Sequence, residues 1–214
     1  MSRLAIKICG LSTPETVGAS VKAGATHLGF NHFPKSPRFV EVERMRALAA
    51  AVPADVGRVA ILVDPDDAML TQLAATGSLT ALQLHGRETP ARAAAIRQRF
   101  ALPVWKAISV KTRADIATAT AYAGAVDFLL FDAKTPDGAA LPGGMGLRFD
   151  WTLLRGMAMA LPWGLSGGLE PGNVADAVRI TGAPLVDVSS GVESAPGIKD
   201  MDKIAAFCEA ARQS

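Results

Sequence analysis

Leu4-Ala5-Ile6-Lys7-Ile8-Cys9-Gly10 is an apolar run that ends in a lone cysteine and a glycine. Ser12-Thr13-Pro14-Glu15 follows it and has the pattern of a capping box with proline in the first turn of a helix. Together they predict a strand that leads directly into a helix. The cysteine at the strand end is either a small buried residue, as free cysteine usually is, or a reactive thiol at the rim of a pocket.

The same strand-then-helix unit recurs along the chain. The predicted strands are Leu4–Cys9, His27–Asn31, Val59–Val63, Ala81–His85, Val104–Ile108, Val126–Phe131, Trp163–Ser166 and Leu185–Ser189. The predicted helices include Glu88–Phe100, Thr112–Ala123 and Asp200–Arg212, with further helix starts at Asp64-Pro65-Asp66-Asp67 and Pro171-Gly172-Asn173. Tight hairpin turns join none of these strands.

Strands that alternate with helices predict a parallel sheet built from βαβ units. Eight such units in 214 residues fit a single-domain (β/α)₈ TIM barrel over residues 1–214, with no linker or low-complexity tract. A doubly wound open sheet is the alternative. That fold usually has fewer strands, and the GxGxxG that often follows its first strand is missing here.

Composition narrows the function. The chain is 50% hydrophobic and 20% charged with a net charge of +2, and no Lys/Arg run suggests nucleic acid or membrane as a partner. Cys9 and Cys208 lie far apart without metal-ligand or disulfide spacing. With no signal-peptide pattern and no apolar stretch near ~20 residues, we expect a protein of the reducing cytoplasm.

Polar residues and glycines follow most predicted strands. They are Cys9, Asn31-His32, Asp64, His85, Ser109, Asp132, Ser166-Gly167-Gly168 and Ser189-Ser190-Gly191. In a parallel barrel all strand ends meet at one face, which is where active sites of this fold lie. So many polar ends at one face predict a site, and they make Cys9 a candidate for catalysis.

The turns after the last two strands predict a phosphate site. Gly167-Gly168 and Ser190-Gly191 let backbone N–H groups approach an anion closely, in the two loops that most often bind phosphate in this fold. Gly143-Gly144-Met145-Gly146 is expected to close over the same anion. The alternative is that these glycines only form tight turns.

Asp132 is a candidate general acid, and Arg38 is a candidate for binding a carboxylate of the ligand. Asp132 ends a strongly apolar strand, and a partly desolvated carboxylate suits a general acid. Its alternative role is to pair with Lys134 or cap a turn. Arg38 follows the stiff loop Pro34–Pro37 and can meet a ligand carboxylate, or it is a solvated loop residue.

Lys7, Lys106 and Asp187 are charged residues inside strands, where an unpaired charge is costly, so we expect them to be paired within the barrel in a structural or field-setting role. Alternation places Lys7 on the face of Cys9, and His85 on the face of Gln83 at the rim. Cys208, Trp105, Trp151 and Trp163 are interpreted as core packing.

Seven motifs together resemble the phosphoribosylanthranilate isomerase family of tryptophan biosynthesis, over essentially the whole chain. They are Lys7-Ile8-Cys9-Gly10, Phe33-Pro34-Lys35-Ser36-Pro37-Arg38, Gln83-Leu84-His85-Gly86, Asp132-Ala133-Lys134-Thr135, Phe149-Asp150-Trp151, Leu165-Ser166-Gly167-Gly168-Leu169 and Asp187-Val188-Ser189-Ser190-Gly191-Val192-Glu193.

The resemblance implies an Amadori rearrangement of N-(5-phosphoribosyl)anthranilate, without a cofactor or metal. It implies that Asp132 is the general acid that opens the sugar ring and that Cys9 is the base that removes the C2 proton. Arg38 would bind the anthranilate carboxylate, with His85 and Asp187 as further substrate-binding residues. Gly167, Gly168, Ser190 and Gly191 would hold the phosphate.

Two departures from the family pattern are Asn31-His32, where two apolar residues are usual, and Met145, where a small hydroxyl residue is usual. The alternative functions are the related isomerase of histidine biosynthesis, a dual-substrate version of it, or a non-catalytic phosphosugar-binding barrel. The family includes both monomers and homodimers, so either state is compatible with the sequence.

Overall fold

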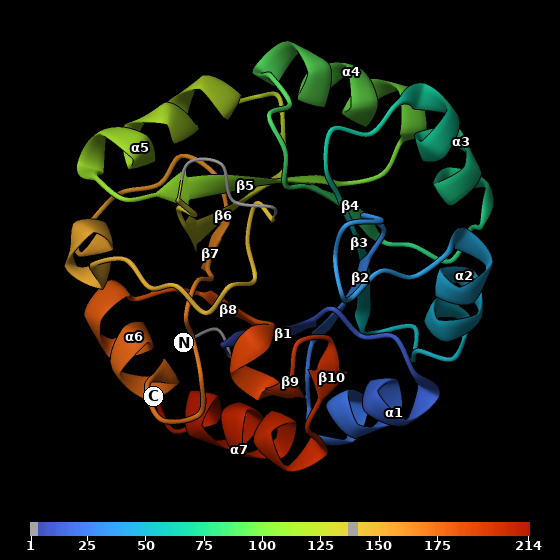
Figure 1. Ribbon diagram of the computed structural model, residues 1–214. Coiled ribbons are helices and arrows are strands. Elements are labelled where there is room, and N and C mark those ends of the chain that lie inside the picture. The colour runs from blue at the N-terminus through green and yellow to red at the C-terminus, as the bar shows by residue number, and fades with distance from the viewer. Residues whose placement is uncertain (1–3, 137–140) are drawn as a thin grey trace.

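The computed structural model describes residues 4–136 and 141–214. Its centre is a closed barrel in which each strand pairs with the next in chain order and β8 pairs with β1 (Figure 1). The barrel strands are β1 (Ala5–Cys9), β2 (His27–Asn31), β3 (Gly57–Leu62), β4 (Ala81–Leu84), β5 (Val104–Val110), β6 (Phe128–Ala133), β7 (Trp163–Leu165) and β8 (Leu185–Val188). The predicted (β/α)₈ fold is confirmed, and every predicted strand boundary lies within two residues of the observed one.

Helices form a ring around the barrel (Figure 1). They are α1 (Pro14–Lys22), α2 (Val42–Ala50), α3 (Asp67–Ala75), α4 (Pro90–Phe100), α5 (Arg113–Ala117), α6 (Val174–Thr181) and α7 (Met201–Arg212), with the 3₁₀ turns η1 (Thr118–Tyr122), η2 (Trp151–Leu154) and η3 (Ser190–Val192). Between β6 and β7, η2 takes the place of a long helix among the residues that are described.

Alternation along the strands separates two cores. Residues such as Ile6, Leu28 and Phe131 belong to the large core between strands and helices. The interior of the barrel holds a smaller cluster, which consists of Val59, Ala81, Trp105, Leu130 and Leu185. The same alternation places Lys7 and Cys9 on the inner face of β1, as predicted.

Local sequence explains where the helices begin. Thr13, not Ser12, caps α1: its hydroxyl accepts a hydrogen bond from the backbone N of Thr16. The predicted capping box on Ser12 is therefore wrong, because a cap at Thr13 places Pro14 at the first helical position, which proline favours. Asp66 caps α3 and Asp200 caps α7 in the same way, so those predicted starts are confirmed.

The predicted helix Thr112–Ala123 is wrong in its second half. Thr112 and Asp115 form a reciprocal capping box at the start of α5, but the α-helix ends at Ala117 and a 3₁₀ turn follows. Thr118 and Thr120 donate hydroxyl hydrogen bonds to the carbonyls of Asp115 and Ala117. Such side-chain bonds to the backbone compete with α-helical bonds and explain the early end.

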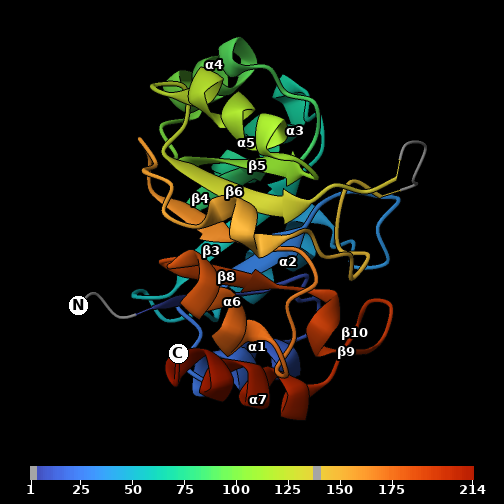
Figure 2. The ribbon, with the colours of Figure 1, turned by 90° about the vertical axis from the view of Figure 1, so that its left-hand side faces the viewer.

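Besides the 3₁₀ turns η2 and η3, the helix α2 was not predicted. Nor was a short antiparallel hairpin of β9 (Glu193–Ala195) and β10 (Ile198–Lys199) between β8 and α7. Figure 2 shows this hairpin and the loop that follows β6 projecting at the end of the barrel opposite the N-terminus. The hairpin therefore stands beside the C-terminal ends of the strands.

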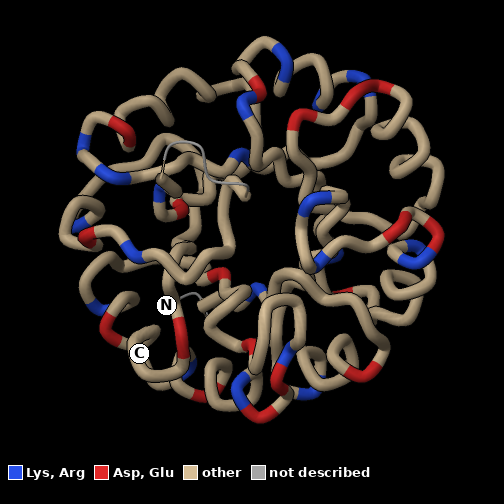
Figure 3. Tube along the Cα trace, viewed as in Figure 1, with Lys and Arg blue, Asp and Glu red and all other residues tan. Residues whose placement is uncertain are grey.

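Charged residues of both signs are interspersed around the outer ring in the view of Figure 3. Single positions of each sign also occur along the trace nearer the centre of this view. Within residues 4–136 and 141–214, none of the helices is long and apolar enough to cross a bilayer.

Titration of His27, at the start of β2, is expected to make the stability of the protein depend on pH. Its ring lies 5.3 Å from that of Trp105, and Nδ1 is 2.9 Å from Oγ1 of Thr26. Burial, and next the positive charge of Lys7, lower the pKa of His27 from 6.5 to about 4. As pH falls, the unfolded chain therefore binds this proton before the folded protein does.

We expect the free energy of unfolding to fall as pH decreases from 6.5 to 4, by at most about 3 kcal/mol from this group. Partial exposure of the ring reduces the effect. His27→Gln, which cannot titrate, should lose less stability over this window, as measured by urea unfolding at pH 7 and 4.5. Equal losses in the two proteins would contradict the assignment.

Candidate active site

One pocket lies at the C-terminal ends of the barrel strands and collects most of the predicted site residues. Eight of them line it, namely Cys9, Arg38, His85, Asp132, Asp187, Gly167, Gly168 and Ser190. The loop of Gly143–Gly146 lines the same pocket, as expected. The barrel topology is the reason, because parallel strands bring residues from β1 to β8 to one face.

Cys9 is the last residue of β1 and is buried. Gly29 on the neighbouring strand gives the thiol its space: a Cβ there would lie 3.1 Å from Sγ of Cys9. Burial raises the pKa of the Cys9 thiol above its ordinary value, and the positive charges of Lys7 and Lys199 only partly oppose this. Lys7, which was predicted on the face of Cys9, therefore acts on this thiol, but burial outweighs its charge.

Lys7 and Asp187 form a buried ion pair across β1 and β8, with Nζ and Oδ2 2.9 Å apart. Burial opposes the Lys7 charge, but Asp187 and Cys9 favour it, and the pKa of Lys7 is raised. Oδ1 of Asp187 has no hydrogen-bond partner among the described residues. Asp187 lines the pocket, and this buried oxygen is an unsatisfied acceptor at the pocket wall.

Lys106 is paired differently from what was predicted. It lies on the face of β5 opposite Trp105, outside the barrel interior, and its Nζ is 2.8 Å from Oε2 of Glu88. Glu88 also accepts hydrogen bonds from the backbone N of Asp64 and of Gly86. Through Glu88, this buried pair therefore fixes the loops after β3 and β4, which include the turn next to His85.

Asp132 and His85 form the polar pair on the other side of the pocket. Oδ2 of Asp132 is 3.1 Å from Nε2 of His85, and Oδ1 accepts from the backbone N of Ala133 at 2.9 Å. Nδ1 of His85 is 3.2 Å from Nε2 of Gln83. With Nδ1 of His85 facing the Gln83 amide nitrogen, Nε2–H of His85 donates to Oδ2 of Asp132. Asp132 pairs with His85, not with Lys134.

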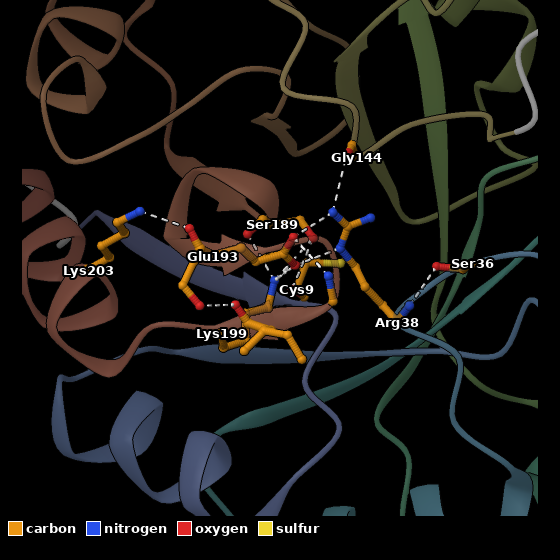
Figure 4. A network of polar contacts seen from close by, with 11 residues as sticks. Cys9, Ser36, Arg38, Gly144, Ser189, Glu193, Lys199 and Lys203 are labelled. Carbon is orange, nitrogen blue, oxygen red and sulfur yellow. Dashed lines mark hydrogen bonds and ion pairs between the residues drawn. The ribbon is translucent and has the colours of Figure 1, made fainter.

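Arg38 is buried at the mouth of the pocket and is not a solvated loop residue. Its guanidinium makes a bidentate ion pair with Glu193, and Nη2 also donates to the carbonyl of Gly144 at 3.0 Å (Figure 4). Glu193 is a residue of the site that sequence reasoning left without a role. Its place two residues after Ser190-Gly191, in a motif shared with the family, was the available signal.

The turns after β7 and β8 meet at the pocket, where the anion cradle is predicted. Gly167 and Gly168 have left-handed backbone conformations and line the pocket together with Ser190. Gly191 does not line it. A Cβ at Gly191 would lie 1.9 Å from the carbonyl oxygen of Leu169, so this glycine lets the two turns pack against each other. Gly191 therefore lies behind the pocket lining, which differs from its predicted place in the anion cradle.

The described residues contain no cluster of three or more His, Cys, Asp or Glu side chains that could hold a metal ion. Asn31 lines the pocket beside Cys9, and the ring of His32 is buried, with Nδ1 2.8 Å from the carbonyl of Val40. Of the departure Asn31-His32, only Asn31 lines the pocket, and the second departure, Met145, lines it as well.

Comparison with known proteins identifies the family of this chain. The model of the N-(5'-phosphoribosyl)anthranilate (PRA) isomerase family matches residues 6–210. The chain belongs to this family. The N-(5'-phosphoribosyl)anthranilate isomerase of Paramagnetospirillum magneticum is 52% identical over 207 residues, which cover 97% of this chain and 96% of that protein. That of Zymomonas mobilis subsp. mobilis is 54% identical over 207 residues, covering 96% of this chain and 97% of that protein.

Solved structures of the PRA isomerase family agree with the fold. The crystal structure of phosphoribosyl anthranilate isomerase from Thermotoga maritima matches with a TM-score of 0.88 and 35% identity, covering 99% of this chain and 100% of the other. A PRA isomerase in complex with reduced 1-(o-carboxyphenylamino)-1-deoxyribulose 5-phosphate matches with a TM-score of 0.83 and 32% identity over the same shares. The family resemblance inferred from the motifs is confirmed.

Proposed function

We propose that this protein converts N-(5-phosphoribosyl)anthranilate to 1-(2-carboxyphenylamino)-1-deoxyribulose 5-phosphate by an Amadori rearrangement in tryptophan biosynthesis. The observation that carries the proposal is the set of groups in one pocket. Asp132 on β6 and Cys9 on β1 are separated around the barrel by β7 and β8, whose turns carry the anion cradle. An acid, a base and a phosphate anchor are the parts that an aldose–ketose shift of a phosphosugar needs.

In the proposed first step, the protonated carboxyl group of Asp132 gives its proton to the ring oxygen. The C1–O bond breaks and the nitrogen lone pair forms a C1=N iminium bond, so the sugar opens to a Schiff base. His85, hydrogen-bonded to Oδ2, holds the carboxyl group in place for this transfer. The phosphate rests in the turns of Gly167-Gly168 and Ser190, which fixes the other end of the substrate.

In the second step, Cys9 first loses its own proton to solvent, and the resulting thiolate removes the proton from C2. The C–H electron pair forms the C1=C2 bond and the iminium electrons return to nitrogen, which gives an enolamine. This species gains a proton at C1 and loses the proton of the C2 hydroxyl to become the ketone, so the reaction is redox-neutral overall. The iminium charge acidifies the C2–H bond and favours the thiolate, which compensates for the burial of Cys9.

The anthranilate carboxylate is proposed to meet Arg38, and the free Oδ1 of Asp187 is proposed to accept a sugar hydroxyl. All of these side chains come from one chain. A Thermotoga maritima relative is described as a dimeric enzyme. We propose that a single chain forms a complete active site here, whether the protein is a monomer or a homodimer.

A fluorescence assay tests the function. Phosphoribosylanthranilate, made enzymatically, should lose its fluorescence at a rate proportional to the amount of protein added. The substrate of the histidine-pathway isomerase should not be turned over, because it has a phosphate at both ends and only the β7 and β8 turns are suited to phosphate among the described residues. No protein-dependent loss would overturn the isomerase proposal and favour a non-catalytic phosphosugar-binding barrel.

A further inference from the structure

The hairpin of β9 and β10 carries two buried charges beside the pocket. Glu193 begins β9 and Lys199 ends β10, and the two residues are paired in the antiparallel register. Both side chains are almost inaccessible to solvent. Buried charges are costly unless they are paired, so their placement on a surface hairpin calls for a partner in the barrel.

That partner is Arg38, which follows β2. Its Nε donates to Oε1 of Glu193 at 2.7 Å and its Nη2 donates to Oε2 at 2.8 Å. Lys199 Nζ donates to Oε1 at 2.7 Å, and the backbone N of Gly197 donates to Oε2 at 3.2 Å. Each carboxylate oxygen of Glu193 therefore accepts two hydrogen bonds (Figure 4).

This contact restricts the guanidinium. A bidentate pair fixes the plane of the group as well as its position. Nη2 is further occupied by the carbonyl of Gly144, whereas Nη1 makes no hydrogen bond to any residue that the structure describes. Since Arg38 lines the pocket, Nη1 is the donor left to a ligand.

Lys199 also changes the net charge of the cluster that it forms with Arg38 and Glu193. Burial opposes the charge of Glu193, but Arg38 and Lys199 hold the pKa of its carboxyl below the usual value, so it is ionised. Arg38 and Glu193 alone would form a neutral pair with little attraction for an anion. Burial lowers the pKa of Lys199, and the Glu193 carboxylate opposes that shift; with Lys199 protonated, the three-residue cluster carries one net positive charge. Its Nζ also donates to the carbonyl of Ser189, next to the anion cradle.

We propose that Glu193, supported by Lys199, is a positioning residue that holds Arg38 ready for an aryl carboxylate of the substrate. The proposal rests on the proposed function, in which Arg38 meets the anthranilate carboxylate. It makes β9–β10 a part of the specificity apparatus and assigns the hairpin a task beyond linking β8 to α7.

The test compares two substrates, phosphoribosylanthranilate and its counterpart made from aniline, which lacks the carboxylate. Glu193→Gln removes a negative charge next to Arg38 and breaks the bidentate contact. If electrostatic attraction alone mattered, the KM for the anthranilate substrate would fall. Positioning predicts the opposite: KM rises about tenfold with kcat changed little, and kcat/KM for the aniline substrate stays unchanged.

Two further variants test whether a rise in KM in Glu193→Gln comes from a general loss of structure. Lys203→Met removes a contact to the same residue, because Lys203 Nζ donates to the backbone carbonyl of Glu193 at 2.8 Å, but it leaves the carboxylate contacts in place (Figure 4). It should keep the KM for both substrates. Glu193→Asp keeps the charge, and should give a KM between those of the wild type and Glu193→Gln.

The outcomes separate the two proposals. A KM that falls or stays constant in Glu193→Gln, or equal losses on both substrates, overturns the positioning role. Arg38→Met should lower kcat/KM for the anthranilate substrate alone; if it lowers kcat/KM equally for both substrates, the assignment of Arg38 to the carboxylate is wrong, and the positioning role fails with it. Absence of turnover of phosphoribosylanthranilate by the wild-type protein would instead defeat the proposed function.

Discussion

Cys9→Ala is expected to lower kcat by about 10³-fold, because the variant loses the proposed base for the C2 proton. Binding of the substrate should survive, since the anion cradle and Arg38 do not depend on the thiol. The measurements are steady-state kinetics by fluorescence and the dissociation constant of reduced 1-(o-carboxyphenylamino)-1-deoxyribulose 5-phosphate.

Cys208→Ala is the matched control. Cys208 is fully buried on α7, far from the pocket lining, and burial raises the pKa of its thiol to about 11. Removing it should leave kcat within about twofold of the wild type, since substitutions away from the site act mainly on stability. If Cys9→Ala kept a tenth or more of wild-type kcat, Cys9 would not be the base.

The raised pKa of Cys9 adds a pH dependence to the same prediction. The thiol of the free protein is protonated at neutral pH because burial disfavours the thiolate. Below that pKa the thiolate fraction grows with pH, so kcat/KM should increase from pH 7 to 9. The residual rate of Cys9→Ala should lack this increase. A profile that is flat in the wild type would contradict the assignment.

Asp132→Asn is expected to lower kcat by about 10³-fold as well, because an amide cannot supply the proton that opens the ring. The amide oxygen can still accept the Nε2–H of His85, so the pocket keeps its shape and KM should change little. Steady-state kinetics on phosphoribosylanthranilate provides the measurement.

Asp66→Asn is the control for this replacement. Asp66 caps α3 through a hydrogen bond from Met69 N and lies outside the pocket, and asparagine caps helices equally well. Its kinetics should match those of the wild type. Wild-type kcat in Asp132→Asn would show that another group opens the ring.

The barrel and the face that carries the site were predictable because both follow from local patterns. Short apolar runs that alternate with capped helices predict parallel strands, and the ends of parallel strands meet at one face. Alternation then assigns Cys9 and Lys7 to the inner side of β1. Cys9 became a candidate for catalysis only because polar residues also follow the other strands.

Other features depend on contacts between distant parts of the chain. Thr118 and Thr120 ended α5 through their own hydroxyl bonds, a competition that helix periodicity does not reveal. Lys106 pairs with Glu88 on the outer side of β5. A buried charge requires a partner, but the sequence does not specify which residue that partner is.

The sequence by itself determined the order of strands, the candidate site residues and the strand ends at which they lie, since these depend on residue type and spacing. Only the tertiary structure decided the state of those residues. Burial, not Lys7, dominates the pKa of Cys9. Arg38 meets Glu193 across 155 residues because barrel closure brings the segments after β2 and β8 together. Desolvation and long-range pairing belong to the folded chain, so no local pattern encodes them.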